Sequence, residues 1–195
     1  MNFEQWRHYA RGLFFEAVKR PTQAIDAYRE ALRHNPEFAQ AARCLAYLHA
    51  ARAAYDEAED YYLLAQRLAP NADTWFNVGF IRDRAGRKPQ AIEAFREAVR
   101  LNPKLDRAWY GMGMAHATLG QHQAAAECLQ HAAELQPMNG HAWYALGMAY
   151  HHTQQVDKVK EVALHMLRFD PKLTQRLIQE AARSDLAHLV KDVVT

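Results

Sequence analysis

The sequence predicts an all-α protein, an α-solenoid built from five helical hairpins and closed by C-terminal capping helices. Prolines, small residues and large aromatic residues each recur along the chain with one common period. Five of the seven prolines are 34, 33, 34 and 34 residues apart, at Pro36, Pro70, Pro103, Pro137 and Pro171. A fixed period of this size is typical of a solenoid, in which each unit buries its apolar face only by stacking on its neighbours.

Small residues predict where the two helices of each hairpin meet. Two helices approach to about 8–10 Å only where the contact is small on both sides. One repeat position holds Gly12, Ala46, Gly79, Gly113 and Gly147, and another holds Ala24, Ala58, Ala91 and Ala125. A third position holds Trp75, Trp109 and Trp143, whose rings fill the space around the contact. Each of the five prolines of the repeat is expected to end a helix, because proline lacks an N–H and clashes with the preceding turn.

These features divide one predicted domain, residues 1–195, into regular parts. The hairpins span about residues 5–38, 39–71, 72–105, 106–139 and 140–173, and a capping segment covers 174–195. Gly86 and Gly120 mark the turns inside their hairpins. Arg7, His8 and Arg11 stand where the internal hairpins are apolar or small, which predicts that the array starts at the first hairpin.

The C-terminal part departs from the pattern. Val159 and Met166 replace alanines of the other hairpins, so the second helix of the fifth hairpin is expected to pack less closely, and Gln154-Gln155 replaces the glycine turn. A helix is predicted over 172–183, and Ser184 is predicted to N-cap a last short helix. The apolar residues of these two helices are Leu173, Leu177, Ile178 and Ala181, then Leu186, Leu189, Val190, Val193 and Val194. We expect them to cover the fifth hairpin; filling a groove or pairing with a second copy are the alternatives.

Composition and charge exclude several classes of function. The 24 Lys and Arg residues nearly balance the 22 Asp and Glu residues, which argues against a nucleic-acid-binding protein. The sequence contains no stretch of eighteen apolar residues, so no membrane span is predicted. The N-terminus also lacks the pattern of a secretory signal. Cys44 and Cys128 show no metal-binding spacing, so we expect two reduced thiols and a cytoplasmic protein.

Catalytic and metal chemistry is not expected either. Most of the eleven histidines fall in the last two hairpins, and no two of them are four residues apart on one helix face. Ser184 is the only serine, which argues against a serine hydrolase. The sequence therefore predicts no enzyme, no cofactor and no metal site. The basic segment 82–88 is interpreted as a solvated turn, with a docking patch for an acidic partner as the alternative.

The repeat resembles the tetratricopeptide repeat (TPR) family over roughly residues 5–173. Its clearest stretch is Trp109-Tyr110-Gly111-Met112-Gly113-Met114-Ala115-His116. Alanine followed four residues later by a large residue recurs as Ala24-x3-Tyr28, Ala58-x3-Tyr62, Ala91-x3-Phe95 and Ala125-x3-Leu129. The resemblance implies a concave surface lined by the first helix of each hairpin, and it implies that the protein binds other proteins.

The resemblance also implies which residues line this peptide-binding groove. Fifth and ninth positions of a first helix lie one turn apart and point the same way. The fifth positions are Tyr9, Arg43, Phe76, Tyr110 and Tyr144, and the ninth positions are Leu13, Tyr47, Phe80, Met114 and Met148. Asn77 and Arg107 add polar groups to the groove. Five large apolar ninth positions predict a continuous stripe for an apolar partner, with burial inside the protein's own curvature as the alternative.

Some TPR proteins hold a chaperone tail in a carboxylate clamp, and this chain departs from that pattern. Leu13, Tyr47 and Phe80 stand where a clamp asparagine is required, although Arg43 and Arg107 remain suited to an acidic group. The predicted function is an adaptor or scaffold that binds an apolar or amphipathic peptide segment. A self-associating scaffold, which is a homo-oligomer, and a chaperone for an apolar secreted protein are the alternatives. The sequence does not identify the partner.

Overall fold

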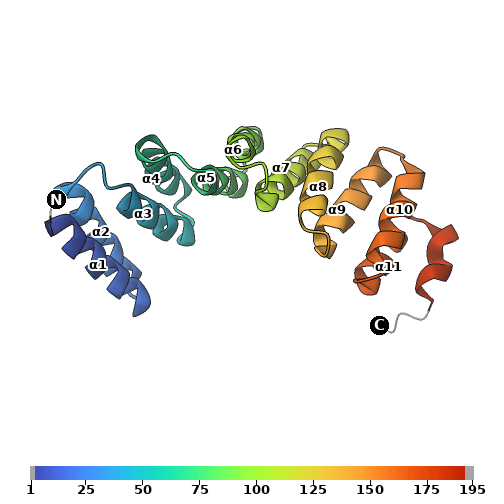
Figure 1. Ribbon diagram of the computed structural model, residues 1–195, viewed down its shortest axis with the longest axis horizontal. Helices are drawn as coiled ribbons and strands as arrows, with labels where there is room; N and C mark the ends of the chain where they lie inside the picture. Colours follow the sequence, from blue (N-terminus) through green and yellow to red (C-terminus); the bar gives the residue numbers. More distant parts are fainter. Residues whose placement is uncertain (1–2, 192–195) are drawn as a thin grey trace. The chain divides into compact units, whose positions relative to one another are not determined.

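The computed structural model describes residues 3–191, and the secondary structure of these residues consists of helices joined by turns and loops (Figure 1). The helices are α1 (Phe3–Ala17), α2 (Pro21–His34), α3 (Ala39–Ala51), α4 (Tyr55–Leu68), α5 (Ala72–Arg84), α6 (Lys88–Leu101), α7 (Asp106–Thr118), α8 (His122–Leu135), α9 (Gly140–His152), α10 (Val156–Met166) and α11 (Pro171–Glu180), followed by a 3₁₀ helix, η1 (Ser184–Val190). The predicted all-α solenoid of five hairpins with C-terminal capping helices is confirmed. In the described part of the chain no helix has the length and hydropathy needed to cross a bilayer.

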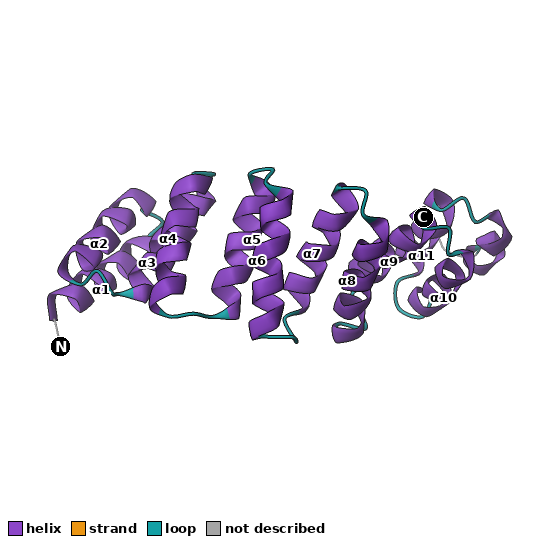
Figure 2. Cartoon of the chain, turned by 90° about the horizontal axis from the view of Figure 1, so that it is seen from above, coloured by secondary structure: helices purple, strands orange, loops and turns teal. Residues whose placement is uncertain are grey.

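The chain forms two compact units, Met1–Leu101 and Asn102–Thr195. The first unit contains three hairpins, α1–α2, α3–α4 and α5–α6, and the second contains α7–α8, α9–α10 and the C-terminal helices. In Figure 2, short loops join successive helices at both ends of the hairpins. Each unit has its own buried clusters, and the larger one, in the second unit, runs from α8 to η1.

Close contact inside the hairpins explains the recurring glycines. A Cβ added at Gly79 would lie 2.6 Å from Cδ1 of Phe95, and one added at Gly113 would lie 2.6 Å from Cγ of Leu129. Gly12 faces the ring of Tyr28 in the same way. The partner in each case is the large residue four positions after the buried alanine, so small and large positions interlock as predicted.

The five turns inside the hairpins share one backbone conformation although only two of them contain glycine. The fifteenth residue of each hairpin has a positive φ, at Lys19 (56°), Ala53 (57°), Gly86 (79°), Gly120 (73°) and Gln154 (59°). Its N–H donates to the carbonyl three residues before it, for example from Ala53 to Ala50 at 2.9 Å. The glycine-free turn at Gln154 therefore follows the same path as the glycine turns.

The fifth hairpin exchanges large and small residues. Val159 and Met166 are buried where the other hairpins have alanine, and Ala163 is buried where they have Tyr28, Tyr62, Phe95 or Leu129. The space next to Gly147 is consequently filled from outside the hairpin. A Cβ at Gly147 would lie 2.7 Å from Cδ2 of Leu177, which belongs to α11.

The capping role of the C-terminal helices is confirmed. Leu177 and Ile178 of α11 and Leu186 and Val190 of η1 are buried in the core of the second unit. Helix α11 begins at Pro171, where the Asp170 carboxylate accepts from the Leu173 N–H at 3.0 Å. It ends at Glu180, three residues before the predicted end, because the chain turns at Ala182, which has φ of 52°.

Ser184 does not N-cap the last helix, contrary to the prediction. Ser184 is the first residue of η1, and Arg183 occupies the N-cap position. The Arg183 guanidinium holds that position by pairing with the Asp185 carboxylate at 2.7 Å and by donating to the Val156 carbonyl. The predicted apolar positions Val193 and Val194 lie outside the described residues.

Candidate functional site

The ninth positions of the first helices present apolar side chains to solvent. Leu13, Tyr47 and Phe80, on α1, α3 and α5 of the first unit, are 45%, 60% and 50% exposed. In the second unit Met114 on α7 is 39% exposed, and Met148 on α9 is half-buried. Burial beneath neighbouring side chains, the alternative considered from the sequence, therefore does not apply to the first four of these residues.

The fifth positions serve the packing of the chain itself. Tyr9 lies among aromatic rings, with centroid distances of 5.9 Å to Trp6, 5.1 Å to Phe38 and 5.6 Å to Tyr28. Burial and the neighbouring Cys44 raise the pKa of the Tyr9 hydroxyl. The ring of Phe76 packs 5.9 Å from that of Phe95, across its own hairpin. These half-buried residues support the surface from which the ninth-position side chains project.

Tyr144 is held by the capping helix α11. Its hydroxyl donates to the Glu180 carboxylate, which also accepts from Nε of Arg176 at 2.7 Å. The Arg176 guanidinium lies 5.2 Å from the centre of the Tyr144 ring. Burial and Glu180 raise the pKa of the Tyr144 hydroxyl. Sequence reasoning missed Arg176 and Glu180, because it considered only the apolar face of this helix and these polar residues lie outside that face.

A cavity of about 290 Å³ lies in the second unit between α7, α8 and α9. Four predicted groove residues line it, Tyr110, Met114, Tyr144 and Met148, together with Ala117, Leu129, Ala145, Ala149, His122, His141 and His152. The lining contains no Asp, Glu, Lys or Arg, and the imidazoles of His122 and His152 stack at 4.2 Å. Burial raises the pKa of the Tyr110 hydroxyl. A cavity of this size and lining accommodates an apolar side chain, with imidazole and phenol groups available for hydrogen bonds.

The polar residues predicted for the groove lie in both units. Arg43 and Asn77 are half-buried in the first unit, and Nη1 of Arg43 is buried without a hydrogen bond to any described residue. Arg107 is exposed on α7, in the second unit. Nη1 of Arg43 therefore faces the interior of the first unit. Asn77 lies three residues before Phe80 on α5, so these two residues share one face of that helix.

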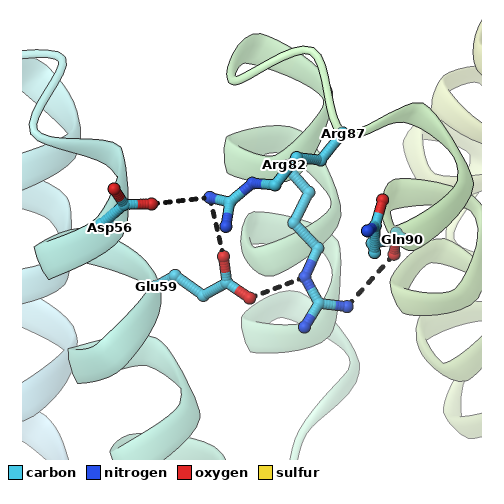
Figure 3. Close-up of polar contacts among 5 residues, drawn as sticks. All are labelled: Asp56, Glu59, Arg82, Arg87 and Gln90. Atoms are coloured by element: carbon cyan, nitrogen blue, oxygen red, sulfur yellow. Dashed lines mark hydrogen bonds and ion pairs between the residues drawn. The ribbon is translucent and has the colours of Figure 1, made fainter.

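The basic segment 82–88 is engaged in ion pairs within the chain (Figure 3). Nε of Arg82 lies 2.7 Å from Glu59, and Arg87 lies 2.9 Å from Glu59 and 3.2 Å from Asp56. Arg82 also donates to the Gln90 carbonyl at 3.1 Å, and Lys88 pairs with Asp83 at 2.6 Å. These contacts join α4 to α5 and α6, so the segment stabilises the first unit and its charge is largely neutralised.

Family comparisons agree with this geometry. The sequence profile of the middle TPR-like domain of cilia and flagella-associated protein 70 matches residues 54–170, more than half of the chain. A tetratricopeptide repeat profile matches residues 9–73. The chain belongs to the tetratricopeptide repeat family. No curated protein sequence matches this TPR protein.

Known TPR structures share the fold of this TPR protein at low sequence identity. YrrB, described as a TPR protein with an unusual peptide-binding site, is 21% identical, with a TM-score of 0.76 over 90% of each chain. MamA is 20% identical, with a TM-score of 0.78 over 96% of this chain and 98% of its own. PilF of Pseudomonas aeruginosa is 18% identical, with a TM-score of 0.72 over 95% of this chain and 87% of its own. Such likeness establishes the architecture.

Proposed function

We propose that this protein is a cytoplasmic adaptor that binds an apolar or amphipathic segment of a partner protein on the ninth-position face of its TPR helices. The observation that carries the proposal is the exposure of four large side chains, Leu13, Tyr47, Phe80 and Met114. Exposed apolar groups that recur at one position of a repeat favour an interaction surface. Among the described residues Cys44 and Cys128 form no disulfide, which supports a reducing compartment.

The geometry favours a partner with separate apolar anchors. In the second unit, Met114 and Met148 border the 290 Å³ cavity, and flexible methionine side chains adapt to more than one anchor. Burying each large side chain contributes roughly 1.5–3 kcal/mol. Association itself costs on the order of 4–15 kcal/mol, so a handful of such contacts corresponds to a micromolar dissociation constant. The function proposed is binding, with no catalytic step.

Matched substitutions test this proposal. Partners captured from the native host by the full chain are mapped to peptides, and each peptide is titrated against Phe80→Glu and Met114→Glu. The controls are Phe14→Glu and Met138→Glu, since these residues are 61% and 73% exposed but stand outside the fifth and ninth positions. We expect at least a tenfold loss of affinity in one or both groove variants and little change in the controls. Unchanged binding by both folded groove variants would remove this face from the function.

Self-association has less support than it had from sequence. The apolar face of α11 that motivated it is buried in the core of the second unit, through Leu177, Ile178 and Ala181. A homo-oligomer stays a prediction, which light scattering of the full chain over a range of concentrations tests. The chaperone alternative also stays a prediction, and no contact in the described residues favours it over a general adaptor.

A further inference from the structure

We propose that the first hairpin carries a binding site for a divalent transition metal, formed by Glu4, His8 and His34. Within residues 3–191 these side chains form a group in which one ligand atom from each lies within 4.8 Å of the others. Nε2 of His8 lies 3.9 Å from Oε2 of Glu4, and the rings of His8 and His34 stack at 5.2 Å. The site is separate from the ninth-position face proposed for partner binding.

The hairpin fixes where these ligands come from. Glu4 and His8 are four residues apart on α1, so they share one face of the helix, and His34 is the last residue of α2. The two helices are locked together where Gly12 meets the ring of Tyr28. Two ligands from one helix and one from its partner therefore converge without any change in the backbone.

The donor set selects the class of metal. Two imidazole nitrogens and one carboxylate oxygen suit Zn²⁺, Co²⁺ or Ni²⁺ better than Mg²⁺ or Ca²⁺, which prefer oxygen ligands. Zinc holds such ligands at about 2.0–2.2 Å in a tetrahedral arrangement, with a fourth position for water. The ligand atoms now lie up to 4.8 Å apart, so metal binding would require side-chain rotations that bring them closer together.

The first hairpin differs from the later hairpins in the residues at the positions of its two histidines. His8 stands at the fourth position, where the third, fourth and fifth hairpins have tryptophan. In the fourth hairpin Trp109 packs on His131 at 4.5 Å, and in the fifth Trp143 packs on His165 at 4.2 Å. An indole cannot bind a metal, but His8 and His34 both can. The first hairpin thus has His8 at the position of this indole, and it has His34 where the fourth and fifth hairpins have Leu135 and Phe169. Glu4 adds a carboxylate one turn from His8.

Charges around the site are compatible with an added cation. Nη2 of Arg7 lies 2.9 Å from Oε2 of Glu4, but the Arg7 side chain is 61% exposed and is free to turn into solvent when a metal takes its place. A cavity of about 250 Å³ adjoins His8 and is lined by Arg11, Asp26 and Glu30 among others, so further carboxylates lie on the same side of the hairpin. Of these, Glu30 pairs with Arg33 at 2.7 Å.

Titration of the full chain, prepared without a histidine tag, tests the site. Zn²⁺ is titrated by calorimetry, and Co²⁺ is followed by the visible absorption of tetrahedral cobalt. We expect one site per chain, and at least a tenfold loss of affinity in each of Glu4→Gln, His8→Ala and His34→Ala. His188→Ala is the matched control, since this exposed histidine lies in η1 of the second unit.

A second measurement does not depend on substitution. Histidines of the native chain are modified with diethyl pyrocarbonate with and without Zn²⁺, and the products are mapped by mass spectrometry. Joint protection of His8 and His34 supports the site. The proposal is overturned if any of the three substitutions leaves Zn²⁺ affinity and stoichiometry unchanged in a folded chain, or if Zn²⁺ protects neither histidine.

Discussion

Ala53 allows the backbone cost of one turn to be measured directly. It joins α3 to α4 with φ of 57°, a conformation that disfavours every residue with a Cβ. The left-handed conformation costs an L-residue roughly 1–2 kcal/mol, whereas glycine adopts it freely. A glycine also lowers the stability of the protein by about 0.5–1 kcal/mol, because it makes the unfolded chain more flexible. The balance predicts that Ala53→Gly stabilises the protein by up to about 1.5 kcal/mol.

Ala51→Gly is the matched control. Ala51 is also exposed and lies two residues earlier, but it is the last residue of α3 and keeps a helical backbone. The same chemical change there gives only the cost of glycine, about 0.5–1 kcal/mol of destabilisation. Two opposite effects are therefore expected from one type of substitution at two neighbouring positions.

Urea unfolding followed by helical circular dichroism measures both variants. The midpoint is expected to rise for Ala53→Gly and fall for Ala51→Gly, with an unchanged denaturant slope, because neither side chain is buried. Gly86→Ala extends the test in the opposite direction, since a Cβ at Gly86 would meet no atom within 4 Å and only its φ of 79° resists the change. If Ala53→Gly destabilises the protein as much as Ala51→Gly does, the positive φ at the fifteenth position carries no backbone strain and the reasoning is wrong.

Three further predictions concern the interior. Gly113→Ala is expected to destabilise by about 1–3 kcal/mol in thermal unfolding, because its Cβ would overlap Leu129, and a double variant with Leu129→Ala should lose less than the sum of the two single changes. Glu59→Gln should lower the free energy of unfolding by about 1–3 kcal/mol, because it weakens the pairing of both Arg82 and Arg87. Lys88→Ala, which removes a more exposed ion pair, should lower it by less than about 1 kcal/mol. Equal losses in the two variants would contradict the described network. Burial raises the pKa of Tyr62 from 10.0 to about 12, which corresponds to a contribution to stability of about 3 kcal/mol. This contribution is present below pH 10 and is lost as the pH rises from 10 to 12. Tyr62→Phe should flatten that part of the stability curve, and an unchanged slope would refute the prediction.

The sequence predicted the fold well because the solenoid is built from local, periodic contacts. Gly79 and Phe95 meet within one hairpin, and the same pair of positions recurs in the first and fourth hairpins, so one interpretation applied along the repeats. The fifth hairpin is the exception, because Gly147 meets Leu177 of α11. The turns were less predictable. Lys19 and Ala53 adopt the same left-handed conformation as Gly86, but neither residue type signals it.

Contacts between different parts of the chain escaped the sequence for a common reason. Glu59 meets Arg82 from the neighbouring hairpin, and Tyr144 meets Glu180, which is 36 residues away. Nothing in the period specifies which charged side chains face each other. The group of Glu4, His8 and His34 was missed similarly, since only pairs of histidines were considered and His34 comes from the second helix. For the groove, the apolar ninth positions were read from the repeat, and the structure adds their exposure.

The exchange of sizes around Gly147 has a consequence for how this array can evolve. Solenoids grow and shrink by duplication or loss of whole repeats, which works only when every repeat offers its successor the same surface. Here Leu177 occupies the gap that Ala163 leaves, so α11 and the fifth hairpin form one inseparable terminal piece. A repeat gained at this end would have to enter before that piece, and copies of the fifth hairpin without α11 would leave a hole beside Gly147.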